Sequence, residues 1–207
     1  MTILALEFSS PQRSVAVGRA GSVVEVVEAG GRGTNAFGLI EKVLAEAGLE
    51  REQIEVIAVG LGPGSYTGIR VAVSIAQGWE LARGVKLLGV STAECLAAQA
   101  QAEKIFGRVN VVIDAQRREF YLAAWEISET GRREIDPLRI VSAAEIQTRA
   151  KAGEVCVGPA AAKTSYPRAA TILSLAAGND SFVSGDKLEP IYLRAANFTK
   201  APPARTC

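Results

Sequence analysis

The stretch AVGLGPGSYTGIRVAVSIAQG, residues 58–78, constrains most strongly how this 207-residue chain can fold. An apolar run typical of a strand ends at Gly60, and Gly62, Pro63 and Gly64 follow before a long run with almost no charge. Glycine and proline clustered after a strand indicate a sharp turn in which the backbone approaches another group closely. The stretch predicts a strand, a tight joint and a buried helix. It leaves open whether the approached group is a nucleotide, a metal-bound substrate or protein.

The predicted helix after this joint is apolar around nearly its whole circumference. Ser65 suits the N-cap position, and Gly68, Ala72 and Ala76 repeat every four residues as a stripe of small side chains. A helix that is apolar on nearly all sides must be covered on more than one face. A stripe of small residues lets a second helix approach closely. We expect either helix 35–47 of this chain or a helix of a partner protein to supply that cover.

The joint itself matches neither of the two common phosphate-binding motifs. No lysine precedes its serine or threonine as in a P-loop, and no suitably placed acidic residue ends a following strand as in a dinucleotide-binding fold. The pattern favours a structural joint between strand and helix, with anion binding at the helix N-terminus as the alternative.

The order of elements along the chain predicts a duplicated α/β fold. The first half reads as strands 2–7, 13–18 and 22–27 in an antiparallel meander, then helix 35–47, strand 54–60, helix 66–82, strand 86–90 and helix 91–103. The second half reads as strands 108–115, 118–127 and 138–141, helix 142–153, strand 154–158 and helix 167–179.

Two such halves predict a two-lobed actin-like (ASKHA, ribonuclease H-like) fold, in which each lobe is a mixed sheet with helices. We expect an N-terminal lobe over 1–104, a C-terminal lobe over 105–197 and a mobile, proline-bearing tail over 198–207.

The composition excludes several classes of function. The chain has no histidine, which removes Ser-His-Asp and Cys-His mechanisms and His-based metal sites. The absence of histidine also argues against a glycoprotease, because a nucleophilic side chain would lack its usual base. A net charge of +1 argues against a freestanding nucleic-acid binder. Cys95, Cys156 and Cys207 are too far apart for a CxxC motif, the N-terminus does not resemble a signal peptide, and no apolar run approaches the ~20 residues that cross a bilayer. We expect a cytoplasmic protein that does not associate with membranes.

Two carboxylates support an alternative function, an independent actin-like ATPase or kinase. Glu7 ends the first strand, where such enzymes carry a phosphate-binding hairpin, and Asp114 ends a strand in the second half. Together they could hold Mg²⁺. Phe8 and Pro11 disfavour a phosphate hairpin, because the hairpin needs glycine and free backbone N–H groups. For Asp114, a turn in which the side chain bonds its own backbone is the favoured interpretation.

Five blocks of the sequence resemble the TsaB (YeaZ) family of bacterial proteins, which take part in the synthesis of threonylcarbamoyladenosine on tRNA. The blocks are ILALEFSS, IAVGLGPGSYTGIRVAVSIAQG, LLGVSTAECLA, VVIDAQRREFY and PIYLR, and they lie in the family's order over essentially the whole chain. The resemblance implies a non-catalytic scaffold that binds and activates the paralogous transferase TsaD, for modification of tRNAs that read ANN codons.

The resemblance also implies where the cofactors, partners and contacts lie. It places metal and nucleotide on partner subunits, namely TsaD and the ATPase TsaE, with no cofactor in this chain and only indirect contact with tRNA. It implies that helices 35–47 and 66–82 meet TsaD, and a homodimer would use the same helices. The contacts expected there are Phe37, Ile40, Leu44, Ile69, Arg70, Val73 and Gln77, next to the motif loop Gly62, Pro63, Gly64, Ser65, Tyr66, Thr67 and Gly68.

The chain departs from the family pattern at three places. Glu7-Phe8 stands where the family usually has Asp-Thr, and Gly31-Arg32-Gly33 stands where it often has a His-Ser pair. Tyr66 replaces the usual phenylalanine of the glycine-rich block. The first departure weakens a phosphate-binding role for the first hairpin, and the second predicts different polar contacts beside the first interface helix.

Overall fold

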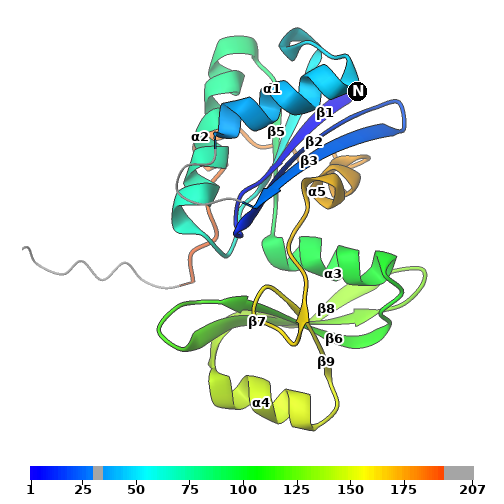
Figure 1. Cartoon of the computed structure of the whole chain (residues 1–207), viewed down its shortest axis with the longest axis vertical. Coiled ribbons are helices and arrows are strands. Elements are labelled where there is room, and N and C mark those ends of the chain that lie inside the picture. The colour runs from blue at the N-terminus through cyan, green and yellow to red at the C-terminus, as the bar shows by residue number, and fades with distance from the viewer. Residues whose placement is uncertain (30–34, 194–207) are drawn as a thin grey trace, which may run out of the picture.

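Two five-stranded sheets form two lobes in the computed structural model, which describes residues 1–29 and 35–193 (Figure 1). The arrangement confirms the two-lobed actin-like, ribonuclease H-like fold predicted from the order of elements. The predicted tail, 198–207, and the Gly31-Arg32-Gly33 segment lie outside the described residues.

The first sheet combines the predicted meander with two parallel strands. Its strands are β1 (Thr2–Glu7), β2 (Gln12–Arg19), β3 (Ser22–Ala29), β4 (Val56–Gly60) and β5 (Lys86–Val90). They lie in the order β3-β2-β1-β4-β5, with β1, β2 and β3 antiparallel and β1, β4 and β5 parallel. β1 is therefore the central strand, and all of its side chains are buried.

Helices cover both faces of this sheet. Helices α1 (Ala36–Ala47) and α2 (Tyr66–Arg83) lie on one face, and α5 (Ala169–Ala176) lies on the other (Figure 1). Because side chains alternate along a strand, Leu4 and Leu6 of β1 pack toward α1 and α2, whereas Ile3 and Ala5 pack toward α5.

The second sheet repeats the topology of the first. Its strands are β6 (Gly107–Asp114), β7 (Glu119–Ile127), β8 (Arg132–Ser142), β9 (Val155–Gly158) and β10 (Lys163–Thr164), in the order β10-β9-β6-β7-β8. Helix α3 (Thr92–Ala102) covers one face and α4 (Ala143–Lys151) the other. β8 begins before the predicted residue 138, and the two-residue β10 was not predicted because it is too short to carry a periodic pattern.

The lobes exchange one helix each, so the predicted boundary at 104/105 does not match the packing. Helix α3 was expected in the first lobe, but Leu96 and Ala97 pack against the second sheet. Helix α5 was expected in the second lobe, but Ile172 packs against the first sheet. Hydrophobic periodicity identifies the apolar face of a helix and does not say which sheet that face meets. The two exchanged helices also contact each other.

Helix α5 is capped by side chains of the sheet on which it lies. Ser14 Oγ accepts a hydrogen bond from the backbone N–H of Ala169 at 2.8 Å, and Glu25 Oε1 accepts one from Ala170 N–H at 3.1 Å. The Glu25 carboxylate also forms an ion pair with Arg168. A carboxylate is stabilising at a helix N-terminus because the first N–H groups there have no partner within the helix.

Glu25→Ala is expected to lower the free energy of unfolding by about 1–3 kcal/mol, since it leaves a helix N–H and a guanidinium without their acceptor. Urea unfolding followed by circular dichroism measures the change. Glu28→Ala is the matched control, because Glu28 lies on the same strand and is exposed. Equal stability of the two variants would show that the Glu25 contacts do not hold α5.

Candidate functional site: a groove between the first two helices

The glycine-rich joint between β4 and α2 packs against the turn that follows β1. The backbone N–H of Ser65 donates to Ser9 O at 2.7 Å. A Cβ atom added to Gly64 would lie 2.2 Å from that same oxygen, and one added to Gly68 would lie 2.0 Å from Phe8 O. The group that this joint approaches is therefore the protein's own backbone, and glycine is required because no side chain fits between the two segments.

The remaining motif residues fix this joint to the neighbouring elements. Ser65 caps α2 as predicted, with its hydroxyl accepting from Gly68 N–H at 3.4 Å. Thr92 at the start of α3 donates through its backbone N–H to Gly62 O at 2.8 Å and through its hydroxyl to Ser9 Oγ at 3.0 Å. The motif therefore joins β1, α2 and α3 at one point.

The two carboxylates of the ATPase alternative both accept hydrogen bonds from their own segments, although the buried Oε2 of Glu7 has no partner among the described residues. Glu7 is fully buried, its Oε1 accepts from Ser9 N–H at 2.6 Å, and a Cβ on Gly60 would lie 2.0 Å from its Oε2. This burial raises the pKa of the Glu7 carboxyl to about 7. Asp114 accepts two hydrogen bonds from Gln116, at 2.7 and 3.0 Å, which confirms the predicted turn. Within the described ranges, no three or more acidic or cysteine side chains gather where they could hold a metal ion.

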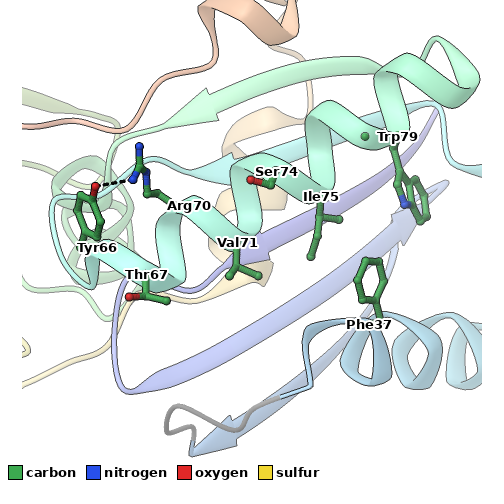
Figure 2. Close-up of a pocket in the computed structure, with 9 residues that line it drawn as sticks. Phe37, Tyr66, Thr67, Arg70, Val71, Ser74, Ile75 and Trp79 are labelled. Atoms are coloured by element: carbon green, nitrogen blue, oxygen red, sulfur yellow. Dashed lines mark hydrogen bonds between the residues drawn. The ribbon is translucent and has the colours of Figure 1, made fainter.

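An apolar groove of about 510 Å³ lies between α1 and α2 (Figure 2). At one end Phe37 of α1 points toward Ile75 and Trp79 of α2, and at the other end stand Tyr66 and Arg70. The Phe37 and Tyr66 side chains are 57% and 56% exposed, although both are large aromatic residues. Exposed aromatic side chains beside an apolar groove make this surface a candidate interaction site.

The floor of this groove is a row of small side chains on the outer face of α2. Thr67, Val71, Ser74 and Gly78 follow one another at spacings of four, three and four residues, so they share one face of the helix. A Cβ atom added to Gly78 would have no neighbour within 4 Å. A face of this kind lets another helix approach closely. The groove is therefore shaped to receive a helix between the aromatic side chains at its ends.

The seven residues predicted as partner contacts divide between two places. Phe37 and Arg70 line the groove. Four others, Ile40, Leu44, Ile69 and Val73, are at most 6% exposed and belong to the core of the first lobe. Their prediction as contacts is corrected, because α1 and α2 each have two apolar faces and the sequence pattern does not say which one meets the sheet. Gln77 is half-buried and donates to Gly185 O at 2.7 Å, and its contact with a partner stays a prediction.

The sequence left open whether this chain or a partner covers the small-residue stripe of α2, and in the structure this chain covers it. Ala72 and Ala76 are fully buried in the first-lobe core, and Gly68 meets the backbone of Phe8. The stripe seats α2 on its own lobe, and the row that begins at Thr67 remains for another molecule. Its spacing of four, three and four is visible in the sequence and was the signal that could have identified the outer face.

Comparisons with known proteins agree with the resemblance seen in the sequence. The family model described as "TsaD: tRNA N6-adenosine threonylcarbamoyltransferase" matches residues 33–204. The chain is 33% identical over 133 residues to the tRNA threonylcarbamoyladenosine biosynthesis protein TsaB of Escherichia coli, an alignment that covers 63% of this chain and 58% of that protein. It is 35% identical over 128 residues to the protein of the same name from Haemophilus influenzae, covering 59% of this chain and 53% of that one. The chain thus spans little more than half the length of these curated relatives.

A solved structure shares the complete fold. YeaZ from Pseudomonas aeruginosa superposes with a TM-score of 0.79 at 24% sequence identity, covering 93% of this chain and 99% of that one.

A further sequence relative aligns along its whole length. This uncharacterized protein of Mycobacterium tuberculosis strain H37Rv aligns over 100% of this chain and 96% of its own length, at 28% identity. Among the described helices, none is long and apolar enough to cross a membrane.

Proposed function

The chain belongs to the TsaB/YeaZ family, within the TsaD-like domains that the family model describes, and from this premise we propose that it is a non-catalytic subunit that binds a TsaD-type threonylcarbamoyltransferase. Its role is to support the formation of threonylcarbamoyladenosine in tRNAs that read ANN codons. The observation that carries this proposal is the groove between α1 and α2, an apolar helix face with no covering element among the described residues.

The dimensions of the groove support a helical partner. The row from Thr67 to Gly78 runs along about three turns of α2, a length of roughly 16 Å at 1.5 Å per residue. The partner helix would lie on the small side chains of this row and fill the space between Phe37 at one end and Tyr66 at the other. Packing of this kind makes α1 and α2 half of a helical bundle that the partner completes.

The carboxylates support a scaffold rather than an independent ATPase. Glu7 is buried beneath Gly60, Asp114 is hydrogen-bonded in its own exposed turn, and among the described residues neither belongs to a cluster of side chains that could hold a metal ion. The metal and nucleotide chemistry of the pathway accordingly belongs to the partner subunits, TsaD and the ATPase TsaE. Contact of this chain with tRNA is indirect.

Ser74→Trp tests the proposal, because it fills the floor of the groove with a bulky side chain at an exposed position. We expect the wild-type chain to co-purify with the TsaD of the same organism in a stoichiometric complex and to support tRNA modification by it. Ser74→Trp is expected to fold normally and to lose both properties. Ser174→Trp is the matched control, because Ser174 is an exposed serine on α5, on the opposite face of the first sheet.

Two results would contradict the proposal. Normal complex formation by Ser74→Trp would show that the groove is not the contact surface. A wild-type chain that stays apart from TsaD and binds ATP–Mg²⁺ in a nucleotide titration would support the ATPase alternative instead.

A further inference from the structure

We infer that Arg70 is the specificity-determining residue of the groove, and that the helix received there carries a carboxylate that pairs with the Arg70 guanidinium. This inference rests on the proposed function and adds the chemistry by which the partner is selected.

The Arg70 side chain is held in place at one end of the groove. Its Nη1 donates a hydrogen bond to the hydroxyl of Tyr66, and its guanidinium carbon lies 4.7 Å from the centroid of the Tyr66 ring (Figure 2). The Tyr66 ring in turn contacts the ring of Tyr192, with centroids 5.6 Å apart. The segment that carries Tyr192 is fixed by Ile191, whose N–H donates to Leu61 O at 2.9 Å. A guanidinium that is already positioned loses less conformational entropy when it forms an ion pair.

Among the described residues, Arg70 is the one charged side chain that lines the groove, and none of the carboxylates described there forms an ion pair with it. In contrast, Arg83 at the end of the same helix pairs with Glu52 at 3.1 Å, and Arg51 beside α1 pairs with Glu41 at 2.5 Å. An occupant that covered Arg70 with apolar atoms would remove its hydration and supply nothing in return. The occupant must therefore provide an anion at this end of the groove.

A second copy of this chain does not meet that requirement. In a symmetric dimer through the groove, the same lining would face itself, and the part of it that the structure describes holds no carboxylate. The neighbouring carboxylate on α1, Glu41, is already paired with Arg51. A nucleic acid is also a poor match, because it brings many phosphates to a groove whose described lining holds one cation between apolar walls. The remaining occupant is an amphipathic helix of another protein that carries a single carboxylate opposite Arg70.

Arg70→Met tests the inference, because it keeps most of the apolar stem and removes the charge. With the TsaD of the same organism as the probe, we expect the dissociation constant to rise at least about tenfold, which is typical when one member of a covered charge pair is lost. The association rate of the wild-type chain should fall between 50 and 300 mM NaCl, and that of Arg70→Met should change much less. Arg83→Met, the same substitution on the same helix outside the groove, should bind within about twofold of wild type.

Two further variants separate the roles of the residues. Tyr66→Phe should weaken binding a few-fold in the wild-type background and have no added effect in Arg70→Met, because Tyr66 acts by positioning the guanidinium. Arg70→Glu should abolish binding, because it sets two carboxylates against each other. Replacing the partner carboxylate of the TsaD helix by lysine should restore binding, because it re-forms the pair with the charges reversed.

The possible results separate a failure of the charge inference from a failure of the proposed function. If Arg70→Met and Arg70→Glu bind like wild type with an unchanged salt dependence, while Ser74→Trp does not bind, the charge inference is overturned and the proposed function stands. If Arg70→Met loses binding to tRNA and keeps normal binding to TsaD, the anion belongs to nucleic acid and the inference is overturned. If the wild-type chain does not bind TsaD, both proposals fail.

Discussion

Gly68→Ala is expected to destabilise the protein by about 3 kcal/mol or more. The added Cβ would lie 2.0 Å from the carbonyl oxygen of Phe8, far inside van der Waals contact. That oxygen belongs to the backbone of the turn after β1, so relief requires α2 to move away from the central strand of its sheet. The movement would also strain the hydrogen bond from Ser65 to Ser9.

The same helix contains the matched control. Gly78→Ala adds a methyl group that meets nothing within 4 Å, so the higher helix propensity of alanine should stabilise the protein by up to about 1 kcal/mol. Urea unfolding of the two variants measures both effects. Similar unfolding midpoints for Gly68→Ala and Gly78→Ala would contradict the close approach of α2 to the turn.

Glu7→Gln is expected to change how the stability depends on pH. The pKa of the buried Glu7 carboxyl is raised from 4.5 to about 7, chiefly by desolvation, whereas in the unfolded chain the group titrates near its ordinary value. Below pH ~4.5 the group is protonated in both states and contributes no pH dependence. Between pH ~4.5 and ~7 the unfolded state releases the proton and the folded state retains it, so folding becomes less favourable as pH rises. Above pH ~7 the group is ionised in both states, and the free energy of unfolding has fallen by about 3 kcal/mol from its value at low pH.

The measurement compares wild type and Glu7→Gln by urea unfolding at pH 4.5, 6 and 8. From pH 4.5 to pH 8 the free energy of unfolding of the variant should rise by about 3 kcal/mol relative to that of wild type, because glutamine does not titrate. The test uses the change with pH, so a constant offset from the new amide does not affect it. Glu28→Gln, at an exposed site, should follow wild type at every pH. Parallel curves for wild type and Glu7→Gln would show that Glu7 titrates normally.

The sequence predicted the secondary structure well wherever a segment carries a strong periodic pattern. Helix α2 begins at Tyr66 as predicted, and Ser65 and Ser91 cap α2 and α3 with their side chains. Ser142 precedes α4 without a side-chain cap, and Glu145 in the first turn of α4 pairs with Arg139.

The sequence could not predict which face of each element meets which surface. The exchange of α3 and α5 between the lobes depends on chain path, and neither helix carries a signal that selects one sheet over the other. In α2, Val73 and Val71 are equally apolar, but Val73 packs in the core and Val71 lines the groove. The contact of Tyr192 with Tyr66 joins residues far apart in the chain and leaves no local pattern in the sequence.

The central claim is that the groove between α1 and α2 is the surface that meets TsaD, and site-specific photo-crosslinking tests it most directly. A photoreactive amino acid is placed at position 74 in one sample and at position 174 in another, and each protein is irradiated with TsaD. We predict a crosslink to a helix of TsaD from position 74 and none from position 174. A crosslink from position 174 with none from position 74 would contradict the claim and place the contact on the opposite face of the first lobe.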